Sequence, residues 1–343
     1  MADIVVKRTE PGDVIGHETV FYENPELYPE LDSILENFPP VSKEMYEAYK
    51  KEHGISGTVP EKAGRFERLD YETSVYEDGI VHPKYCNVYL PWCYDPEDKE
   101  RKYNVLYYQH GNTCDPELFV QPFLKVLLDR LFYTEGVEPC IVVCTTYYFD
   151  VTKDVEERRT TGNVPAGDGN YEGVKANFWK EITQDLIPLV ESRYNTYLEG
   201  TSEDEVKNAR DHRAFSGYSR GCVATWYMFH NAFEFFRYFI PMSCMTTAGK
   251  DIKNPPTKEE VLAYLTEPVK AHPELPFFVY ALNGGPADVV PMTEQMKYVP
   301  DAEEFSYGRD PEKNNIFFAV SGYFHGDFFA PMYLYNALPV LFG

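Results

Sequence analysis

The sequence lacks the features that mark several specialised classes of protein. No apolar run approaches the length of a membrane span, and the N-terminus shows no charged-then-apolar leader pattern. This argues against a membrane protein and leaves open an intracellular protein or one whose leader was removed. The seven cysteines are odd in number and form no C-x-x-C pair, so neither a disulfide framework nor a zinc site is indicated. No internal repeat and no low-complexity tract is present.

Basic side chains are scarce beside acidic ones. There are 32 Lys and Arg against 55 Asp and Glu, which gives a net charge of −23. Such a field repels nucleic acid and anionic membrane surfaces, and it favours an uncharged substrate. Hydrophobic residues make up 43% of the chain and aromatic residues 16%, so we expect a large folded core. The aromatic content also suits a pocket that stacks on rings or sugars.

The pattern of apolar residues divides the chain in two. Residues 1–62 are rich in Pro and Glu, with one helical stretch at 42–54, and we expect an N-terminal extension or strap there. Residues 63–343 are expected to form the main domain, which opens with two alternating, antiparallel strands. Buried strands then alternate with helices, which predicts an α/β fold: a mainly parallel central sheet with helices on both faces. Ligands of such sheets bind beyond the carboxyl ends of the strands.

The expected elements follow one another along the main domain. The alternating strands are at 64–76 and 84–94; the buried strands are at 103–111, 139–148, 212–219, 238–244, 276–285 and 315–326; the helices are at 116–136, 177–197, 220–236, 257–267 and 330–342.

Ser219 stands in a G-x-S-x-G pattern between Gly217 and Gly221, at the junction of a buried strand and a helix. The pattern alone is a modest signal, and a plain glycine-rich turn is the alternative. In the strand–turn–helix context, however, the two glycines let the backbone bend sharply and push the serine hydroxyl outward. The hydroxyl then lies near a helix N-terminus, where amide dipoles favour negative charge. Ser219 is therefore the candidate nucleophile.

A serine nucleophile needs a histidine base that is held by a carboxylate. In an α/β-hydrolase the chain order is Ser, acid, His, and only His230, His272 and His325 follow Ser219. His325 is the one that comes just after a strand, so it is the candidate base, and Asp288, in the loop after the preceding strand, is the candidate acid. The competing carboxylates are Asp301, Glu303, Glu304 and Asp327.

Acyl transfer also needs donors for the developing oxyanion. One candidate is the amide of Arg220, directly after the nucleophile, and the other comes from the Gly111–Asn112 loop after an earlier buried strand. His110 precedes the serine in the chain, so we expect it to shape this loop by hydrogen bonding rather than to act as a base.

Several stretches together resemble a known family. They are "NVYLPWCYD", "YNVLYYQHGN", "WKEITQDLIPLVESRYNTY", "DHRAFSGYSRGCVATWYMF", "YFIPMS" and "LYNALPVLF". Over about residues 64–343 the chain is similar to the feruloyl-esterase and acetyl-esterase group of α/β-hydrolases, carbohydrate esterase family 1. The resemblance implies an α/β-hydrolase with Ser219 as nucleophile, His325 as base, Asp288 as acid and the oxyanion amides named above, with no metal and no cofactor.

The resemblance also implies the partners of the protein. They are feruloylated or acetylated xylan and its oligosaccharides. The acidic charge and the lack of a membrane span predict no nucleic-acid and no membrane partner, and the location, secreted or cytoplasmic in a bacterium, stays open. The chain departs from the family in three places: Arg220 stands where Met or Leu is common, "HGDFF" stands where His is often followed closely by Trp, and 150–177 reads as a long loop beside the site. These departures bear on substrate choice rather than on the type of reaction. The oligomeric state stays open.

The acyl group is the least determined part of the hypothesis. Ferulic and related hydroxycinnamic acids need a flat apolar slot, for which Tyr147, Trp179, Tyr218 and Phe324 are the candidates, although each residue type is more often core. Acetyl release from xylan is the rival activity. A non-catalytic carbohydrate-binding relative is a further alternative, but the intact Ser, Asp and His in the correct order argue against it. A peptidase of the same fold is another, and the absence of a propeller-like repeat domain from the sequence argues against that one.

Overall fold

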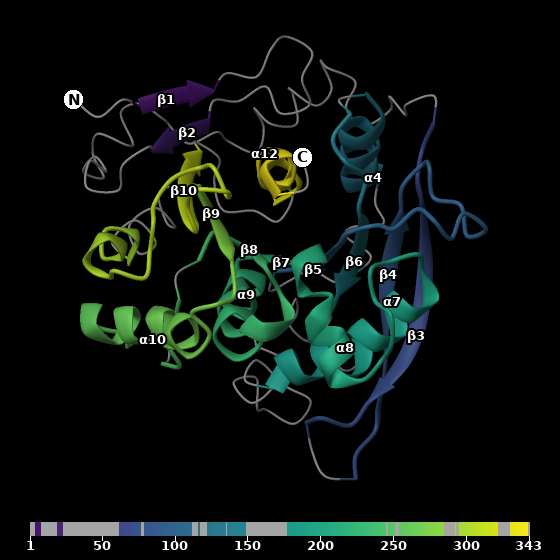
Figure 1. Ribbon diagram of the computed structural model, residues 1–343, viewed down its shortest axis with the longest axis horizontal. Helices are drawn as coiled ribbons and strands as arrows, with labels where there is room; N and C mark the ends of the chain where they lie inside the picture. Colours follow the sequence, from purple (N-terminus) through teal and green to yellow (C-terminus); the bar gives the residue numbers. More distant parts are fainter. Residues whose placement is uncertain are drawn as a thin grey trace, which may run out of the picture.

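A computed structural model describes most of the main domain and two short stretches of the N-terminal region (Figure 1). The described residues are 4–7, 19–22, 62–76, 79–111, 116, 122–134, 136–148, 177–244, 246–250, 254–284, 292, 295–321 and 330–341.

A single sheet of ten strands in the described residues runs through the molecule, in the order β1-β2-β10-β9-β8-β7-β5-β6-β4-β3. Six neighbouring strands, from β10 to β6, pair in parallel, and the antiparallel pairs β1–β2 and β3–β4 lie at the two edges. The strands are β1 (Ile4–Lys7), β2 (Thr19–Tyr22), β3 (Arg65–Thr73), β4 (His82–Leu90), β5 (Val105–Gln109), β6 (Ile141–Thr145), β7 (Arg213–Tyr218), β8 (Tyr238–Met242), β9 (Phe278–Gly284) and β10 (Ile316–Ser321). The expected mainly parallel sheet is confirmed.

Helices cover both faces of this sheet, as expected. Two separate apolar clusters lie against it: α4 and α12 pack into one, and α7, α9 and α10 into the other. The helices are α4 (Pro122–Asp129), α7 (Ile187–Arg193), α8 (Glu203–Asn208), α9 (Arg220–Asn231), α10 (Lys258–Ala271) and α12 (Ala330–Leu341), with π-helical segments η2 (Arg130–Thr134) and η3 (Glu181–Leu186). Among the described helices, none has the length and apolar character needed to cross a bilayer.

Two helices differ from the expectation. The short helix α8 was not expected; Ser202 caps it by accepting from the amide of Glu205, whose carboxylate accepts from the amide of Ser202 in return. Helix α10 continues through Pro268 to Ala271, although the pattern placed its end at Glu267. A proline ends a helix only where tertiary packing does not hold the next turn, and here Pro268 and Val269 are buried against the core.

Of residues 1–62, the structure describes β1, β2 and Lys62. The strand β2 pairs antiparallel with β10, so this part of the chain adds to the edge of the sheet. The expected helix at 42–54 lies outside the described residues, and the division into a strap and a main domain at residue 62 stays a prediction.

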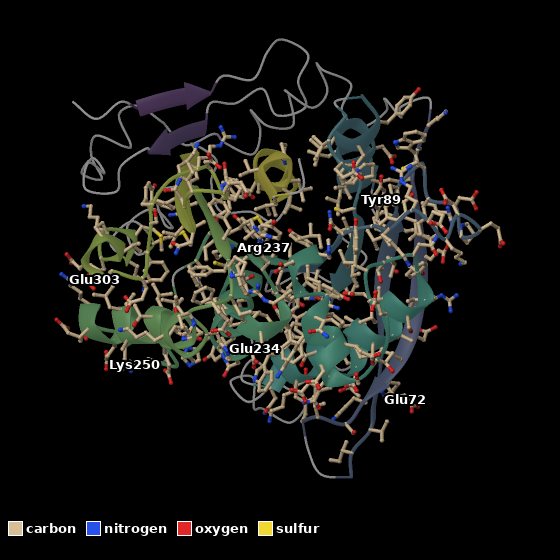
Figure 2. All side chains as sticks on the ribbon, in the orientation of Figure 1. Glu72, Tyr89, Glu234, Arg237, Lys250 and Glu303 are labelled. Carbon is tan, nitrogen blue, oxygen red and sulfur yellow. The ribbon has the colours of Figure 1, made fainter. Side chains whose placement is uncertain are left out.

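A buried ion pair fixes the amino end of the strand that carries the candidate nucleophile. Arg213, the first residue of β7, places its Nε 2.5 Å from Oε1 of Glu191 in α7, and both side chains are buried. Tyr107 on β5 donates to the same carboxylate at 3.0 Å. Other charged side chains, such as Glu72 and Glu303, lie at the periphery of the molecule (Figure 2).

Candidate active site

Ser219 forms a sharp turn between β7 and α9. Its φ is 57° and its ψ is −113°, a left-handed backbone conformation that disfavours any side chain. The amide of Ser219 donates to the carbonyl of Met242 at 2.9 Å, and its own carbonyl accepts from the amide of Cys222 at 2.9 Å. The turn is therefore held on one side by the neighbouring strand β8 and on the other by the first turn of α9.

The two glycines of the motif are required by close backbone contacts. A Cβ on Gly217 would lie 2.2 Å from the carbonyl oxygen of Gly221. A Cβ on Gly221 would lie 2.2 Å from the carbonyl oxygen of Gln109 and 2.9 Å from that of His110. Real Cβ atoms do not approach backbone oxygens so closely, so only glycine allows helix α9 to sit directly on the ends of β7 and β5.

The same contact brings the Gly111 loop to the start of α9. Because Gly221 touches the carbonyls of Gln109 and His110, the end of β5 and the first turn of α9 are neighbours. Arg220, half-buried, is the first residue of α9, so its backbone amide lies in the first turn at the N-terminus of this helix. Asn112 lies outside the described residues.

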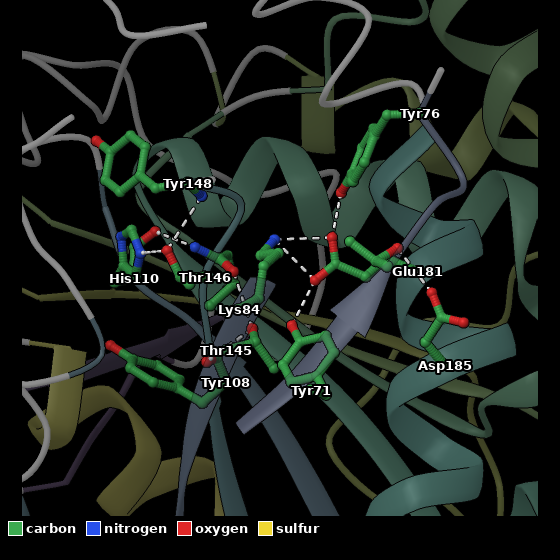
Figure 3. Close-up of polar contacts among 12 residues, drawn as sticks. Tyr71, Tyr76, Lys84, Tyr108, His110, Thr145, Thr146, Tyr148, Glu181 and Asp185 are labelled. Carbon is green, nitrogen blue, oxygen red and sulfur yellow. Dashed lines mark hydrogen bonds and ion pairs between the residues drawn. The ribbon is translucent and has the colours of Figure 1, made fainter. Parts of the chain in front are cut away.

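His110 is buried and hydrogen-bonded on both ring nitrogens (Figure 3). The Gly111 carbonyl, 2.6 Å from Nδ1, only accepts, so Nδ1 carries the proton. Nε2 then accepts from the Thr146 hydroxyl at 2.8 Å, and that hydroxyl accepts from the amide of Tyr148 at 3.1 Å. Burial lowers the pKa of His110 to about 3, below its ordinary 6.5, so the ring is neutral at working pH. These contacts are those of a loop-shaping histidine.

The three described candidates for the substrate slot lie in different surroundings. Tyr147 is buried, and its hydroxyl donates to the carbonyl of Gly111 at 3.0 Å. Tyr218 is buried and stacks on Tyr333 at 6.1 Å between ring centroids. Trp179 is partly exposed and lines a groove of about 450 Å³ together with Asn231, the last residue of α9, among others. Phe324 lies outside the described residues.

The candidate base and acid also lie outside the described residues, but the strands that precede them are described. β9 ends at Gly284, four residues before Asp288, and β10 ends at Ser321, four residues before His325. Gly284 and Ser321 are partners in the parallel register. Because β7, β8, β9 and β10 are parallel neighbours, both loops leave the edge of the sheet at which Ser219 stands.

Ser243 is a feature of this edge that the sequence did not signal. It follows β8 and is in register with Ser219, since Tyr218 and Met242 are partners. Its φ is 59°, it is 1% exposed, and its hydroxyl has no hydrogen-bond partner among the residues that the structure describes. Nothing in the local sequence "IPMSC" distinguishes this serine from an ordinary strand end.

A second buried polar cluster, on β3, β4 and η3, lies on the sheet beside the His110 contacts (Figure 3). The ammonium of Lys84 lies 2.7 Å from the carboxylate of Glu181, and both side chains are fully buried. The hydroxyls of Tyr71 and Tyr76 donate to the same carboxylate. Burial and this carboxylate raise the pKa of both tyrosines well above the ordinary value, so both stay protonated donors.

No disulfide joins the six cysteines in the part of the chain that the structure describes, and no group of His, Cys, Asp and Glu there is arranged to hold a metal ion.

The parallel sheet, the strained serine turn and the helix seated on it define an α/β-hydrolase. The chain belongs to the esterase family: the family model described as "Putative esterase" matches residues 82–274. The resemblance to esterases noted from the sequence is therefore confirmed.

Three similar proteins place the chain within this group. The feruloyl esterase module of Clostridium thermocellum, solved as a serine-to-alanine mutant with sinapinate, is 26% identical, with a TM-score of 0.67 over 89% of this chain and 93% of that one. A ferulic acid esterase of the CE1 family from the anaerobic fungus Anaeromyces mucronatus shares the fold, at 14% identity and a TM-score of 0.54 over 84% and 95% of the two chains. Endo-1,4-beta-xylanase Y of Acetivibrio thermocellus is 32% identical over 288 residues, 82% of this chain. The chain spans only 23% of that xylanase's length.

Proposed function

We propose that this protein hydrolyses the ester bond that joins ferulic or related hydroxycinnamic acids to plant cell-wall arabinoxylan. Ser219 is the nucleophile, His325 the base and Asp288 the acid, and the amides of Arg220 and of the Gly111–Asn112 loop hold the oxyanion. The substrates are feruloylated or acetylated xylan and its oligosaccharides, and the part of the substrate that reacts is uncharged.

The reaction runs in two steps, acylation of Ser219 and hydrolysis of the acyl-enzyme. His325 takes the hydroxyl proton of Ser219 as Oγ bonds to the ester carbonyl carbon, and the oxyanion rests on the two amides. The ester C–O bond then breaks, and the imidazolium returns its proton to the sugar alcohol. Water attacks the acyl-enzyme with His325 again as base, which releases the free acid and restores Ser219. Asp288 stabilises the imidazolium in both steps.

The observation that carries the proposal is the strained turn at Ser219. A φ of 57° at a non-glycine residue is unfavourable, and in a strand–turn–helix between two glycines with no room for a Cβ it is typical of a nucleophile turn. The preference for hydroxycinnamoyl esters is supported by the likeness to a feruloyl esterase module that was solved with sinapinate, and the link to xylan by the likeness to a xylanase.

The test is a panel of ester substrates with the wild type and Ser219→Ala. We expect the wild type to release ferulate from methyl ferulate and from feruloylated arabinoxylan, and Ser219→Ala to lose several powers of ten in kcat. Faster release of acetate from acetylated xylan than of ferulate would assign the enzyme to acetyl xylan instead. Near-full activity of Ser219→Ala, or xylan binding without hydrolysis of any ester, would refute the proposal.

A further inference from the structure

The groove of about 450 Å³ that Trp179 lines lies between three helical parts of the chain. Its walls come from residues 179–188 at η3 and α7, from residues 201–207 at α8, and from residues 231–235 at the end of α9 and in η5 (Phe233–Phe235). Small-molecule sites usually have volumes of about 300–1,000 Å³. Asn231 ends a helix of 12 residues that begins directly after Ser219, so the groove extends to about 18 Å from the nucleophile along α9.

One wall of the groove is a π-helical segment that turns two side chains to the same side. In η3 the amide of Ile187 donates to the carbonyl of Ile182, five residues earlier, whereas an α-helix joins residues four apart. The wider turn brings Gln184 to the side of the helix on which Trp179 lies, and both line the groove. Such π-helical turns are frequent at functional sites.

The inner side of the same helix is anchored in the protein interior. Glu181 is fully buried, and its carboxylate lies 2.7 Å from the ammonium of Lys84 (Figure 3). The hydroxyl of Tyr71 donates to the same carboxylate at 2.5 Å. Ile182 and Leu186 are buried on this side as well. The wall is therefore formed before a ligand arrives, and binding there requires little ordering of the backbone.

The uncharged side chains of the groove suit a sugar. Trp179 is partly exposed and Gln184 is exposed, and neither side chain makes a hydrogen bond within the described residues. Asn231, also exposed, adds a second carboxamide to the lining. A sugar ring has C–H groups on its faces, which pack on a flat aromatic ring, and hydroxyls at its edge. A carboxamide both donates and accepts, as a sugar hydroxyl does.

The charged side chains of the groove are engaged with one another. The ammonium of Lys207 lies 2.8 Å from the carboxylate of Glu203 and 3.2 Å from that of Glu234, so one cation is shared by two carboxylates. Together the three carry a net negative charge, which disfavours phosphate and carboxylate ligands. Both carboxylates already face a cation, which weakens their attraction for a basic ligand. An uncharged ligand rich in hydroxyls therefore fits this groove best.

We propose that this groove binds an unesterified stretch of the xylan chain, with Trp179 packed on the face of a sugar ring and the carboxamides of Gln184 and Asn231 on its hydroxyls. The inference rests on the proposed function, which supplies xylan as the polymer. It assigns Trp179 to the sugar chain rather than to the acyl group. The groove holds the polymer at a distance from the ester that reacts.

The first test measures the binding of xylohexaose to the full chain by isothermal titration calorimetry. Xylohexaose has no ester, so the protein does not consume it. We expect Trp179→Ala to weaken binding at least about tenfold and Gln184→Ala about three- to tenfold. Tyr197→Ala is the matched control, because Tyr197 is an aromatic residue with 39% exposure that lies outside the groove lining. We expect it to bind xylohexaose as the wild type does.

The second test separates a sugar-binding role of Trp179 from a role beside the acyl group. The KM of Trp179→Ala is measured for feruloylated arabinoxylan and for methyl ferulate, which has the same acyl group and no sugar. We expect the ratio of the first KM to the second to rise about tenfold over that of the wild type, because only the polymer reaches the groove. Circular dichroism checks that each variant is folded. Gln184→Ala replaces an exposed side chain and serves if Trp179→Ala does not fold.

The outcomes separate the groove from the proposed function. A wild type that does not bind xylohexaose, or that binds it no better than Trp179→Ala and Gln184→Ala do, would overturn the groove and leave the esterase intact. Equal rises of both KM values, with xylohexaose binding unchanged, would place Trp179 beside the acyl group and also overturn the groove. A wild type that binds xylohexaose through Trp179 but hydrolyses no ester would refute the proposed function and support the groove.

Discussion

The backbone strain at Ser219 predicts that the protein becomes more stable when its candidate nucleophile is replaced by glycine rather than by alanine. Neither Ser219→Ala nor Ser219→Gly has the hydroxyl, so the difference between them isolates the backbone. A side chain at φ 57° and ψ −113° costs about 1–3 kcal/mol, and glycine removes this cost. Glycine also makes the unfolded chain more flexible, which costs about 0.5–1 kcal/mol relative to alanine. The balance is about 1 kcal/mol in favour of Ser219→Gly.

The assay is urea unfolding of the two variants, followed by circular dichroism. The matched control is Ser192, an exposed residue in α7 with ordinary helical neighbours. At Ser192 we expect the glycine variant to have a free energy of unfolding about 0.5–1 kcal/mol lower than that of the alanine variant. The sign of the difference therefore reverses between the two sites. If Ser219→Gly were also less stable than Ser219→Ala by this amount, the turn would carry no strain and the reasoning from it would be wrong.

Three further predictions concern the surroundings of the site. Gly221→Ala forces a Cβ to within 2.2 Å of the Gln109 carbonyl, so we expect a loss of about 1–3 kcal/mol in urea unfolding together with most of the esterase activity; a stable, active variant would contradict the close contact. The His110 pKa of about 3 lies below the ordinary 6.5, so the folded state binds fewer protons and loses stability as the pH falls from about 6.5 toward 3. The wild type should therefore lose more stability than His110→Asn between pH 7 and 4. A difference in free energy of unfolding between the two proteins that does not change with pH would refute this. Lys84→Met leaves the buried Glu181 carboxylate without its cation and should cost about 3–5 kcal/mol, most of which Lys84→Met/Glu181→Leu recovers; a double variant as unstable as the single would argue against an uncompensated charge.

The fold was predictable because its strands are of two distinct kinds. The parallel strands, such as β5 and β6, are buried along their whole length and read as mainly apolar runs, whereas β3 alternates exposed and buried residues. Helix α8 was missed because it is six residues long and has one buried residue, Val206, so it offers no apolar period. The end of α10 was misplaced because packing against the core outweighed the proline.

The turn that carries the candidate nucleophile was predictable from the sequence, but the distant side chains that contact the neighbouring loop were not. The G-x-S-x-G pattern located the turn at Ser219 because the glycines meet a local steric need. The contact of Tyr147 with Gly111 joins residues 36 positions apart, and no local pattern encodes it. Tyr147 was expected in the substrate slot on the strength of its place after a strand; its hydroxyl donates to the Gly111 carbonyl, and its place in the slot stays a prediction. The roles of Asp288 and His325 stay predictions.

The central claim is that Ser219 attacks the ester and carries the acyl group. Rapid acid quenching during turnover of methyl ferulate, followed by peptide mass spectrometry, measures this most directly. The account predicts a feruloyl adduct on the peptide that contains Ser219, present in the wild type and missing from Ser219→Gly. An adduct on a different residue, or ferulate release by Ser219→Gly at the wild-type rate, would contradict it.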